Sequence, residues 1–304
     1  MRRMWAVLAV AAMFLSAACS TDPDPEEDPA KYLSGTVQIG ANSDLPGWSD
    51  YVNGVWSGFD ISLANWLGHK VGFTPQFLPM TTNERMIKLR EASVPGVTAP
   101  PIKLVISNFS MTDDRRKEID FAGPYFSTYQ GLLTLSSRPV NELREIEGRE
   151  VCVTAGSTNQ DRIGGFKVLP LPQSTLKQCM DALYAGSVVA VTSDVGVLNG
   201  FAARDPKRLR VSPVQVGTER YGIGMPNNRP RLCAFLKAKL TEFVDEAWDQ
   251  KFKDSLPGIA PQASKPNSQA LDPCEQPRPV AQGPAPSATT RAATLTTSAR
   301  RRRR

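Results

Sequence analysis

The sequence has few of the residues from which most catalytic and metal sites are built. Its 304 residues include a single histidine and five cysteines, with no CxxC pair and no cluster of cysteine with histidine. The ligand spacing of a zinc site is therefore missing. His69 follows Leu67 and Gly68 near a helix end, where we expect a solvated residue rather than a metal ligand or a base. The sequence predicts no metal and no cofactor.

The chain also lacks a basic body, although its net charge is +6. Residues 275–304 hold seven arginines and one glutamate, and Arg2 and Arg3 add two positive charges, which leaves residues 4–274 at −2. A nucleic-acid-binding protein needs a basic face on its folded part. We therefore expect no nucleic-acid partner, and we interpret the Pro-, Ala-, Thr- and Arg-rich residues 275–304 as a disordered tail.

The N-terminal apolar run, residues 4–15, is too short to cross a bilayer. It follows two arginines and leads into three small residues before Cys19, the order found in secretory signals. We interpret residues 1–19 as a lipoprotein signal peptide whose lipidated Cys19 holds the protein on the extracytoplasmic face of the cell membrane. A plain cleaved signal is the alternative. Residues 20–35 are rich in proline and charge, and we interpret them as a flexible tether.

Export places the chain in an oxidising compartment, where disulfides form. Four cysteines follow Cys19, and four cysteines allow three connectivities. We favour the pairs Cys152–Cys179 and Cys233–Cys274, because each pair falls inside one proposed structural unit.

Strands and helices alternate along the rest of the chain, with apolar residues at period two or at helical spacing. Residues 92–101 are a breaker-rich insertion, and two long extended stretches cover 125–137 and 220–225. This alternation predicts an α/β fold with two units whose sheets are largely parallel. The predicted strands cover 36–41, 73–78, 104–110, 150–154, 168–171 and 188–191, and the predicted helices cover 56–68, 83–91, 176–184, 197–203 and 231–252.

Residues 104–126 join an apolar strand to a polar turn and a short charged helix. Arg115, one turn into that helix, can reach back with a planar guanidinium suited to a carboxylate. The stretch is either an anion-binding turn or an ordinary capped surface helix with solvated arginines. The groups that the turn offers to an anion belong to Ser107, Asn108, Ser110 and Thr112.

Residues 107–126 resemble the signature of the polar amino-acid-binding proteins of ABC importers, the extracellular solute-binding protein family 3. Further blocks at 58–64, 151–160 and 221–223 resemble the first helix, the second-lobe strand and turn, and the return crossover of that family. The resemblance covers roughly residues 36–256.

The resemblance implies an α/β, two-lobed, type II periplasmic-binding-protein-like fold that closes around a ligand by hinge motion. Lobe one would span residues 36–124 plus 224–274, and lobe two would span 130–218. Two hinge strands, at 125–129 and 219–223, would join them. Such a protein would act as a monomer, with a free amino acid as ligand and an ABC permease in the membrane as partner.

The resemblance also implies which residues contact the ligand. Arg115 would clamp the α-carboxylate together with the N–H and hydroxyl of Ser110, and the Asn108 carbonyl would accept from the α-ammonium. Zwitterion binding needs one buried cation and one buried anion, and strand ends facing a cleft are where α/β sheets place them. The whole implied set is Asn42, Asp44, Trp48, Phe59, Asn108, Ser110, Arg115, Ser157, Thr158 and Asp194.

In lobe two, Thr158 and the backbone at Ser157 would donate to the same carboxylate from a helix N-terminus, where the dipole favours negative charge. Asp194 would pair with the ammonium, and its alternative role is that of a helix N-cap. Trp48 and Phe59 would flank the ligand, although Phe59 could equally be a core aromatic residue.

Asn42, Asp44 and Leu45 lie in the loop that faces the ligand side chain in relatives. Because this loop holds no cationic side chain, we expect glutamine, asparagine, glutamate or aspartate as the ligand. The resulting hypothesis is a substrate-binding lipoprotein of an amino-acid importer. A sensor that signals to a membrane partner is an alternative, and a dehydratase-like enzyme on the same fold is disfavoured, since no Ser/His/Asp or Cys/His arrangement exists.

Overall fold

The computed structural model describes residues 28–92, 102–257, 259 and 264–274. The predicted signal peptide, the Cys19 lipidation site, the first part of the tether and the tail at 275–304 lie outside the described residues, as does most of the insertion at 92–101. In the described part of the chain, no helix has both the length and the apolar character needed to cross a membrane.

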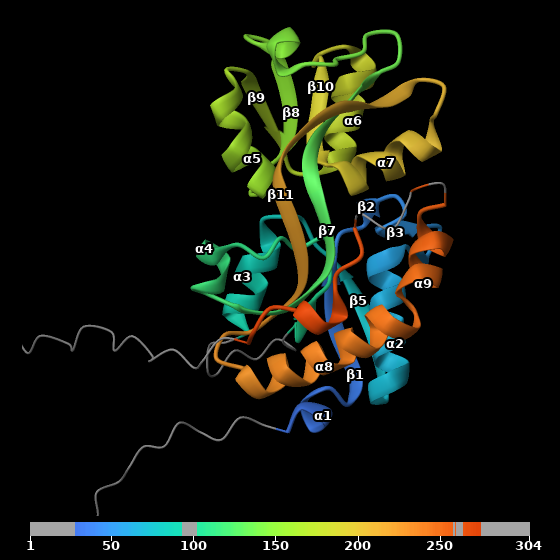
Figure 1. The fold of residues 1–304 in the computed structure, drawn as a ribbon, viewed down its shortest axis with the longest axis vertical. Coiled ribbons are helices and arrows are strands. Elements are labelled where there is room, and N and C mark those ends of the chain that lie inside the picture. The colour runs from blue at the N-terminus through green and yellow to red at the C-terminus, as the bar shows by residue number, and fades with distance from the viewer. Residues whose placement is uncertain (1–27, 93–101, 258, 260–263, 275–304) are drawn as a thin grey trace, which may run out of the picture.

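The chain folds into two lobes joined by two long strands, β7 (Asp120–Leu135) and β11 (Leu209–Met225) (Figure 1). These strands pair antiparallel at the centre of an eight-stranded sheet with the order β5-β1-β6-β11-β7-β10-β8-β9. The sheet therefore runs through both lobes, and its two central strands form the hinge. This arrangement is the predicted type II fold.

Lobe one contains the parallel strands β1 (Gly35–Ala41), β5 (Phe73–Pro79) and β6 (Leu104–Val105). A small antiparallel sheet, β2 (Asp44–Leu45), β3 (Ser49–Val52) and β4 (Val55–Ser57), lies beside them. Its helices are α1 (Pro29–Tyr32), α2 (Phe59–Val71), α3 (Glu84–Glu91), α4 (Asp113–Arg116), α8 (Pro230–Glu246) and α9 (Trp248–Ser255), with a 3₁₀ turn at Ser268–Ala270.

Lobe two contains the parallel strands β8 (Glu150–Thr154), β9 (Leu169–Gln173) and β10 (Ala190–Asp194). Its helices are α5 (Thr158–Ile163), α6 (Leu176–Ala185) and α7 (Val195–Arg204), with 3₁₀ turns at Leu143–Ile146 and Gly164–Phe166. Helices α5 and α7 begin where β8 and β10 end. The first turns of these helices consequently lie at the end of lobe two that faces lobe one (Figure 1).

A cluster of aromatic rings packs where the lobes and the hinge meet. The Trp48 ring lies 4.6 Å from that of Phe126 on β7 and 5.5 Å from that of Tyr221 on β11, both edge to face. Its indole Nε1–H donates to the Gly196 carbonyl of lobe two at 2.9 Å. Edge-to-face aromatic pairs contribute roughly 0.5–1.5 kcal/mol each beyond burial, so this cluster stabilises the contact between Trp48 and the two hinge strands.

Both predicted disulfides are confirmed. Cys152–Cys179 joins β8 to α6 inside lobe two, and Cys233–Cys274 ties the last described residue to α8.

Several local predictions differ from the structure. The strand predicted at 104–110 is only β6 (Leu104–Val105), and residues 56–57 of the helix predicted at 56–68 belong to β4. The predicted tether ends earlier than expected, because Asp28 caps helix α1 and Leu33 is fully buried. The helix predicted to stop at Gly68 continues to Val71, and Gly72, at φ +93°, ends it instead. The helix predicted at 231–252 is two helices, α8 and α9, that meet at Ala247. The sheet is mixed rather than largely parallel, because β7 and β11 pair antiparallel.

Candidate ligand-binding site

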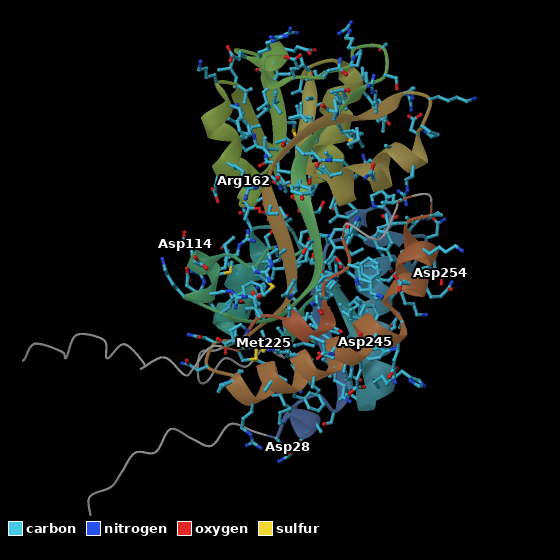
Figure 2. The ribbon with its side chains drawn as sticks, viewed as in Figure 1. Asp28, Asp114, Arg162, Met225, Asp245 and Asp254 are labelled. Atoms are coloured by element: carbon cyan, nitrogen blue, oxygen red, sulfur yellow. A yellow bond between two sulfur atoms is a disulfide. The ribbon has the colours of Figure 1, made fainter. Side chains whose placement is uncertain are left out.

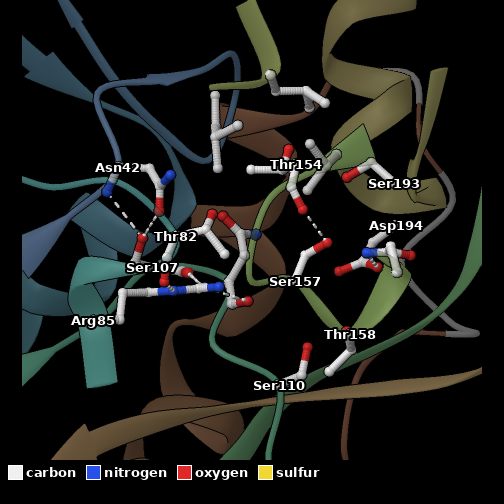
Figure 3. A pocket seen from close by; sticks show the side chains of 15 residues that line it. Asn42, Thr82, Arg85, Ser107, Ser110, Thr154, Ser157, Thr158, Ser193 and Asp194 are labelled. Atoms are coloured by element: carbon white, nitrogen blue, oxygen red, sulfur yellow. Dashed lines mark hydrogen bonds between the residues drawn. The ribbon is translucent and has the colours of Figure 1, made fainter. Parts of the chain in front are cut away.

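A small cavity of about 40 Å³, partly open to solvent, lies between the lobes. Lobe-one residues form one side of it and lobe-two residues the other (Figure 3). Polar side chains dominate its lining, and hydrogen-bonding groups of this kind orient a bound ligand. The lining residues are Asn42, Leu45, Thr82, Arg85, Ser107, Asn108, Ser110, Thr154, Ser157, Thr158, Asn159, Leu176, Ser193, Asp194 and Val197.

Asn42 and Ser107 come from neighbouring strand ends in lobe one. Strands β1 and β6 are parallel, so the residues that follow them meet at one edge of the sheet. The Asn42 N–H donates to the Ser107 hydroxyl oxygen at 2.9 Å, and the Ser107 hydroxyl donates to the Asn42 side-chain oxygen (Figure 3). This reciprocal pair fixes both side chains at the cavity wall.

Asn108 has the left-handed backbone conformation, at φ +47°. Its N–H donates to the buried carboxylate of Asp60 at 3.0 Å, and the Tyr125 hydroxyl donates to the same carboxylate at 2.8 Å. Burial raises the pKa of Asp60 to about 7. The side-chain Nδ2 and Oδ1 of Asn108 are both buried and have no hydrogen-bond partner among the described residues. Such atoms normally find partners, so the Asn108 amide is open to a ligand.

Arg85 brings a buried cation to the lobe-one side of the cavity. It lies at the start of α3, is 5% exposed, and donates from Nη1 to the carbonyls of Ser107 (2.7 Å) and Asn108 (3.2 Å). Its Nη2 makes no hydrogen bond, and its guanidinium no salt bridge, within the part of the chain that the structure describes. Burial, and next the nearby Arg115, lower the pKa of Arg85 to about 9. A buried cation without an acidic partner favours an anionic group in the cavity.

Asp194 brings a buried anion to the lobe-two side. Its carboxylate accepts from Asn159 Nδ2 at 2.9 Å and from the Tyr221 hydroxyl, and it is 4% exposed. Burial, and next the negative charge of Glu219, raise the pKa of Asp194 to about 7. Asp194 makes no salt bridge with any described residue, so a cationic group in the cavity would stabilise its charged form.

The first turn of α5 completes this side of the cavity. The Ser157 side chain accepts from the Gln160 N–H and donates to the Thr154 carbonyl at 2.7 Å (Figure 3). The Thr158 hydroxyl donates to Glu219 at 2.9 Å. The backbone N–H groups of Thr158 and Asn159 have no partner among the described residues and lie at a helix N-terminus, where the dipole favours an anion.

The structure brings six of the ten residues expected at the ligand to this cavity. They are Asn42, Asn108 and Ser110 from lobe one, and Ser157, Thr158 and Asp194 from lobe two. The structure places the other four, Asp44, Trp48, Phe59 and Arg115, outside the lining set.

Arg115 spans the cleft beside the cavity. Its guanidinium donates to the Ser110 carbonyl at 2.9 Å and, across the lobes, to the Gly156 carbonyl at 3.3 Å, and it lies 5.1 Å from the Phe109 ring. Burial lowers its pKa, whereas Glu219 and other acids raise it. Arg115 therefore lies outside the cavity lining, and its Nη1 and Nη2 donate to backbone carbonyls.

Asp44 contacts lobe two rather than the cavity. Its carboxylate accepts the Lys177 N–H at 3.0 Å in the first turn of α6. The negative charge lies at a helix N-terminus, a favourable position. Burial raises the pKa of Asp44, and the Lys177 N–H opposes that effect. Asp44 therefore links the two lobes.

Trp48 and Phe59 belong to the core. Both side chains are fully buried, and their rings lie 5.8 Å apart in the hinge cluster. For Phe59 this is the core-residue alternative. The Trp48 backbone packs closely over Gly58, where a Cβ would lie 2.2 Å from the Trp48 carbonyl oxygen. Asp194 occupies the N-cap position of α7, but its side chain makes no capping hydrogen bond.

Sequence reasoning missed Arg85 and Asn159. Asn159 follows the predicted Thr158, and its buried Oδ1 has no partner among the described residues. Arg85 lies in a charged segment whose pattern is typical of a surface helix. One signal was available, because the polar run from Thr81 to Arg85 follows β5, whose carboxyl end lies at the same sheet edge as that of β1.

Comparisons with known proteins agree with this fold. The model of the bacterial extracellular solute-binding proteins, family 3, matches residues 37–255. A glutamine-binding protein of Geobacillus stearothermophilus is 28% identical over 264 residues, which cover 77% of this chain and 96% of that protein. An ABC transporter glutamine-binding protein of Bacillus subtilis is 23% identical over 266 residues, covering 82% and 94%.

Among solved structures, a solute receptor for L-cysteine of Neisseria gonorrhoeae superposes with a TM-score of 0.69 at 20% identity, covering 79% of this chain and 98% of that one. At this identity the likeness shows the fold. The family model, by contrast, matches well over half of the chain. This chain belongs to the bacterial extracellular solute-binding proteins of family 3.

Proposed function

We propose that the protein captures a free acidic or amide amino acid outside the cell and delivers it to an ABC-type importer. The observation that carries this proposal is the pair of buried, oppositely charged groups on the two sides of one cavity, Arg85 on lobe one and Asp194 on lobe two. Related glutamine-binding proteins, one of them from an ABC transporter, support the role. Lipidation of Cys19 would anchor the protein beside the importer.

The α-amino acid backbone would bind in the cavity as a zwitterion. Its ammonium would bind Asp194, with the unpartnered oxygen of Asn159 as a second acceptor. Its carboxylate would lie near Ser110 and the first-turn amides of α5, with Arg115 beside it. Because both lobes hold the same small molecule, binding would stabilise the closed arrangement.

The ligand side chain would face Arg85. Lobe one brings two positive charges to the cleft, those of Arg85 and Arg115, and the α-carboxylate of the ligand would balance only one of them. One positive charge therefore remains for the ligand side chain to balance. A side-chain carboxylate balances that charge, and a side-chain amide oxygen accepts a hydrogen bond without balancing it. We therefore place glutamate and aspartate first and their amides second.

Binding without chemical turnover is part of the proposal. The cavity lining contains no histidine or cysteine, and His69 is exposed at the far end of α2. Turnover of prephenate or arogenate by the purified protein would overturn this part.

Isothermal titration of the purified protein with each of the twenty amino acids tests the proposal. We expect tight binding of glutamate, aspartate or their amides, and loss of measurable binding in Arg115→Ala, whose side chain holds the turn at Ser110. Arg116→Ala, one residue further along α4, is the matched control and should retain binding. Absence of binding to any amino acid would contradict the proposal.

A further inference from the structure

A second buried acid, Glu219, lies just behind the lobe-two side of the cavity. Its side chain is 2% exposed although it stands on a strand that crosses from one lobe to the other. One carboxylate oxygen accepts from the Thr158 hydroxyl at 2.9 Å and from Arg162 Nη1 at 2.6 Å. An acid of this kind is buried only at considerable cost, so its contacts indicate a specific role.

An irregularity in β11 directs Glu219 inward. The pairing of β11 with β7 shifts register between Val216 and Glu219, and Gly217 adopts φ +57°. A Cβ at Gly217 would lie 2.8 Å from Arg162 Nε, so the glycine also makes room for the arginine. Bulges of this type re-aim a side chain next to functional sites.

The Glu219 contacts extend to the other hinge strand. Arg162 Nη1 also donates to Gln130 Oε1 on β7 at 3.1 Å, and Gln130 Nε2 donates to the Asn159 carbonyl at 3.2 Å and to Thr192 at 2.9 Å. Arg162 lies at the end of lobe two that faces lobe one (Figure 2). One connected set of hydrogen bonds therefore joins both hinge strands to the first turn of α5.

The same carboxylate acts on Asp194 through space. Next to burial, the charge of Glu219 is the largest cause of the raised pKa of Asp194, while Tyr221, Asn159 and Arg162 lower it. Arg85 and Arg115 approach from α3 and α4 of lobe one, and Asp194 in turn opposes the lowering of their pKa values.

We infer that Glu219 is a positioning residue that fixes the ligand-facing turn of α5 to the hinge and thereby couples ligand contact to lobe closure. The inference rests on the proposed function. It assigns Glu219 no contact with the ligand, because Thr158 and Asn159 stand between them in the chain of hydrogen bonds and Glu219 is absent from the cavity lining.

Two substitutions separate the positioning effect from a general loss of structure. Glu219→Gln keeps the shape and removes the charge, so it weakens the Arg162 contact and relieves the repulsion on Asp194. We expect amino-acid affinity at pH 8 to fall about tenfold, as for the loss of one charged hydrogen bond. We also expect a shift to lower pH of the pH midpoint of binding, which is the pH at which affinity has fallen to half of its value at pH 8. Glu219→Asp keeps the charge and shortens the reach to Thr158. We expect a similar loss of affinity with the midpoint unchanged.

Isothermal titration between pH 5.5 and 8 measures both quantities, with Glu150→Gln, an exposed acid of β8, as the control. Wild-type affinity and midpoint in both Glu219 variants, or loss of affinity in Glu219→Gln without a shift of the midpoint, would overturn the inference. If Glu219→Gln does not fold, wild-type affinity in Glu219→Asp alone overturns it. Failure of the wild-type protein to bind any amino acid is a different result, because it removes the proposed function itself.

Discussion

The two sides of the cavity carry opposite buried charges. Lobe one presents Arg85, with Arg115 beside it, and neither makes a salt bridge to a described residue. Lobe two presents Asp194, and the second acid behind it, Glu219, is already paired with Arg162. Each side thus keeps a charge that its own lobe does not neutralise.

These opposite charges give a physical reason for lobe closure and ligand binding to occur together. Bringing a positive and a negative side close in a low-dielectric cleft stabilises both, but hydrogen bonds to backbone carbonyls and hydroxyls satisfy them only in part. A ligand with a carboxylate and an ammonium supplies the missing partners to both lobes at once. Removing the charge of lobe one and removing the charge of lobe two should therefore weaken ligand binding in different ways.

The largest effect is expected on the lobe-two side. Asp194→Asn keeps the size of the side chain but removes the anion that we assign to the ammonium. Losing one partner of a buried charge pair costs about 2–5 kcal/mol, so affinity should fall at least about 30-fold. Titration calorimetry measures the loss. Asp181→Asn, an exposed acid of the same lobe, should bind like the wild type.

On the lobe-one side the effect should depend on the ligand. Arg85→Met removes the cation that we assign to the ligand side chain, so glutamate should lose about 10- to 100-fold in affinity and glutamine less. Arg90→Met, on the same helix but half exposed and paired with Glu118, is the control. Equal losses for glutamate and glutamine would remove Arg85 from side-chain recognition.

The lobe-two charge also predicts a pH dependence. In the free protein the pKa of Asp194 is raised to about 7, and an ammonium beside it would lower that pKa. Below pH 7, binding must therefore release a proton, and affinity should fall by up to about tenfold per pH unit, with little change above pH 7. Affinity that stays constant from pH 5.5 to 8 would show that the Asp194 carboxylate does not contact the ammonium group of the ligand.

The smallest effect is expected where the lobes touch away from the cavity. Asp50 of β3 pairs with Arg204 of α7, whose side chain is more than half exposed. Such a pair contributes about 0–1 kcal/mol, so Arg204→Met should weaken every ligand by the same factor of at most about five. A change in the order of ligand preference would instead mean that this contact shapes the cavity.

The two sides also differ in how far the sequence predicts them. The family resemblance implied Ser157, Thr158 and Asp194, and the sequence pattern agrees with it, because these residues stand at strand ends or in the first turn of a helix and so lie at the sheet edge. The fold class and both disulfides were predictable for a similar reason, because strand–helix alternation and cysteine positions within one unit are local features.

The lobe-one side depends more on tertiary contacts. Arg85 lies on a helix whose remaining residues are mostly exposed, so only the approach of the strand ends of β1 and β6 reveals its burial. Trp48 and Asp44 share one loop, yet Trp48 turns into the hinge core and Asp44 reaches helix α6. Neither direction follows from residue type or spacing, because both are set by segments more than 70 residues away in the chain.

The central claim is that the cavity holds an amino acid by its two backbone charges. Titration of the purified protein at pH 8 with glutamate, N-acetylglutamate and glutarate tests this claim, because the three share the side-chain carboxylate and only glutamate has the ammonium. We predict that glutamate binds and that the other two bind at least about 30-fold more weakly. Equal binding of all three would contradict the account.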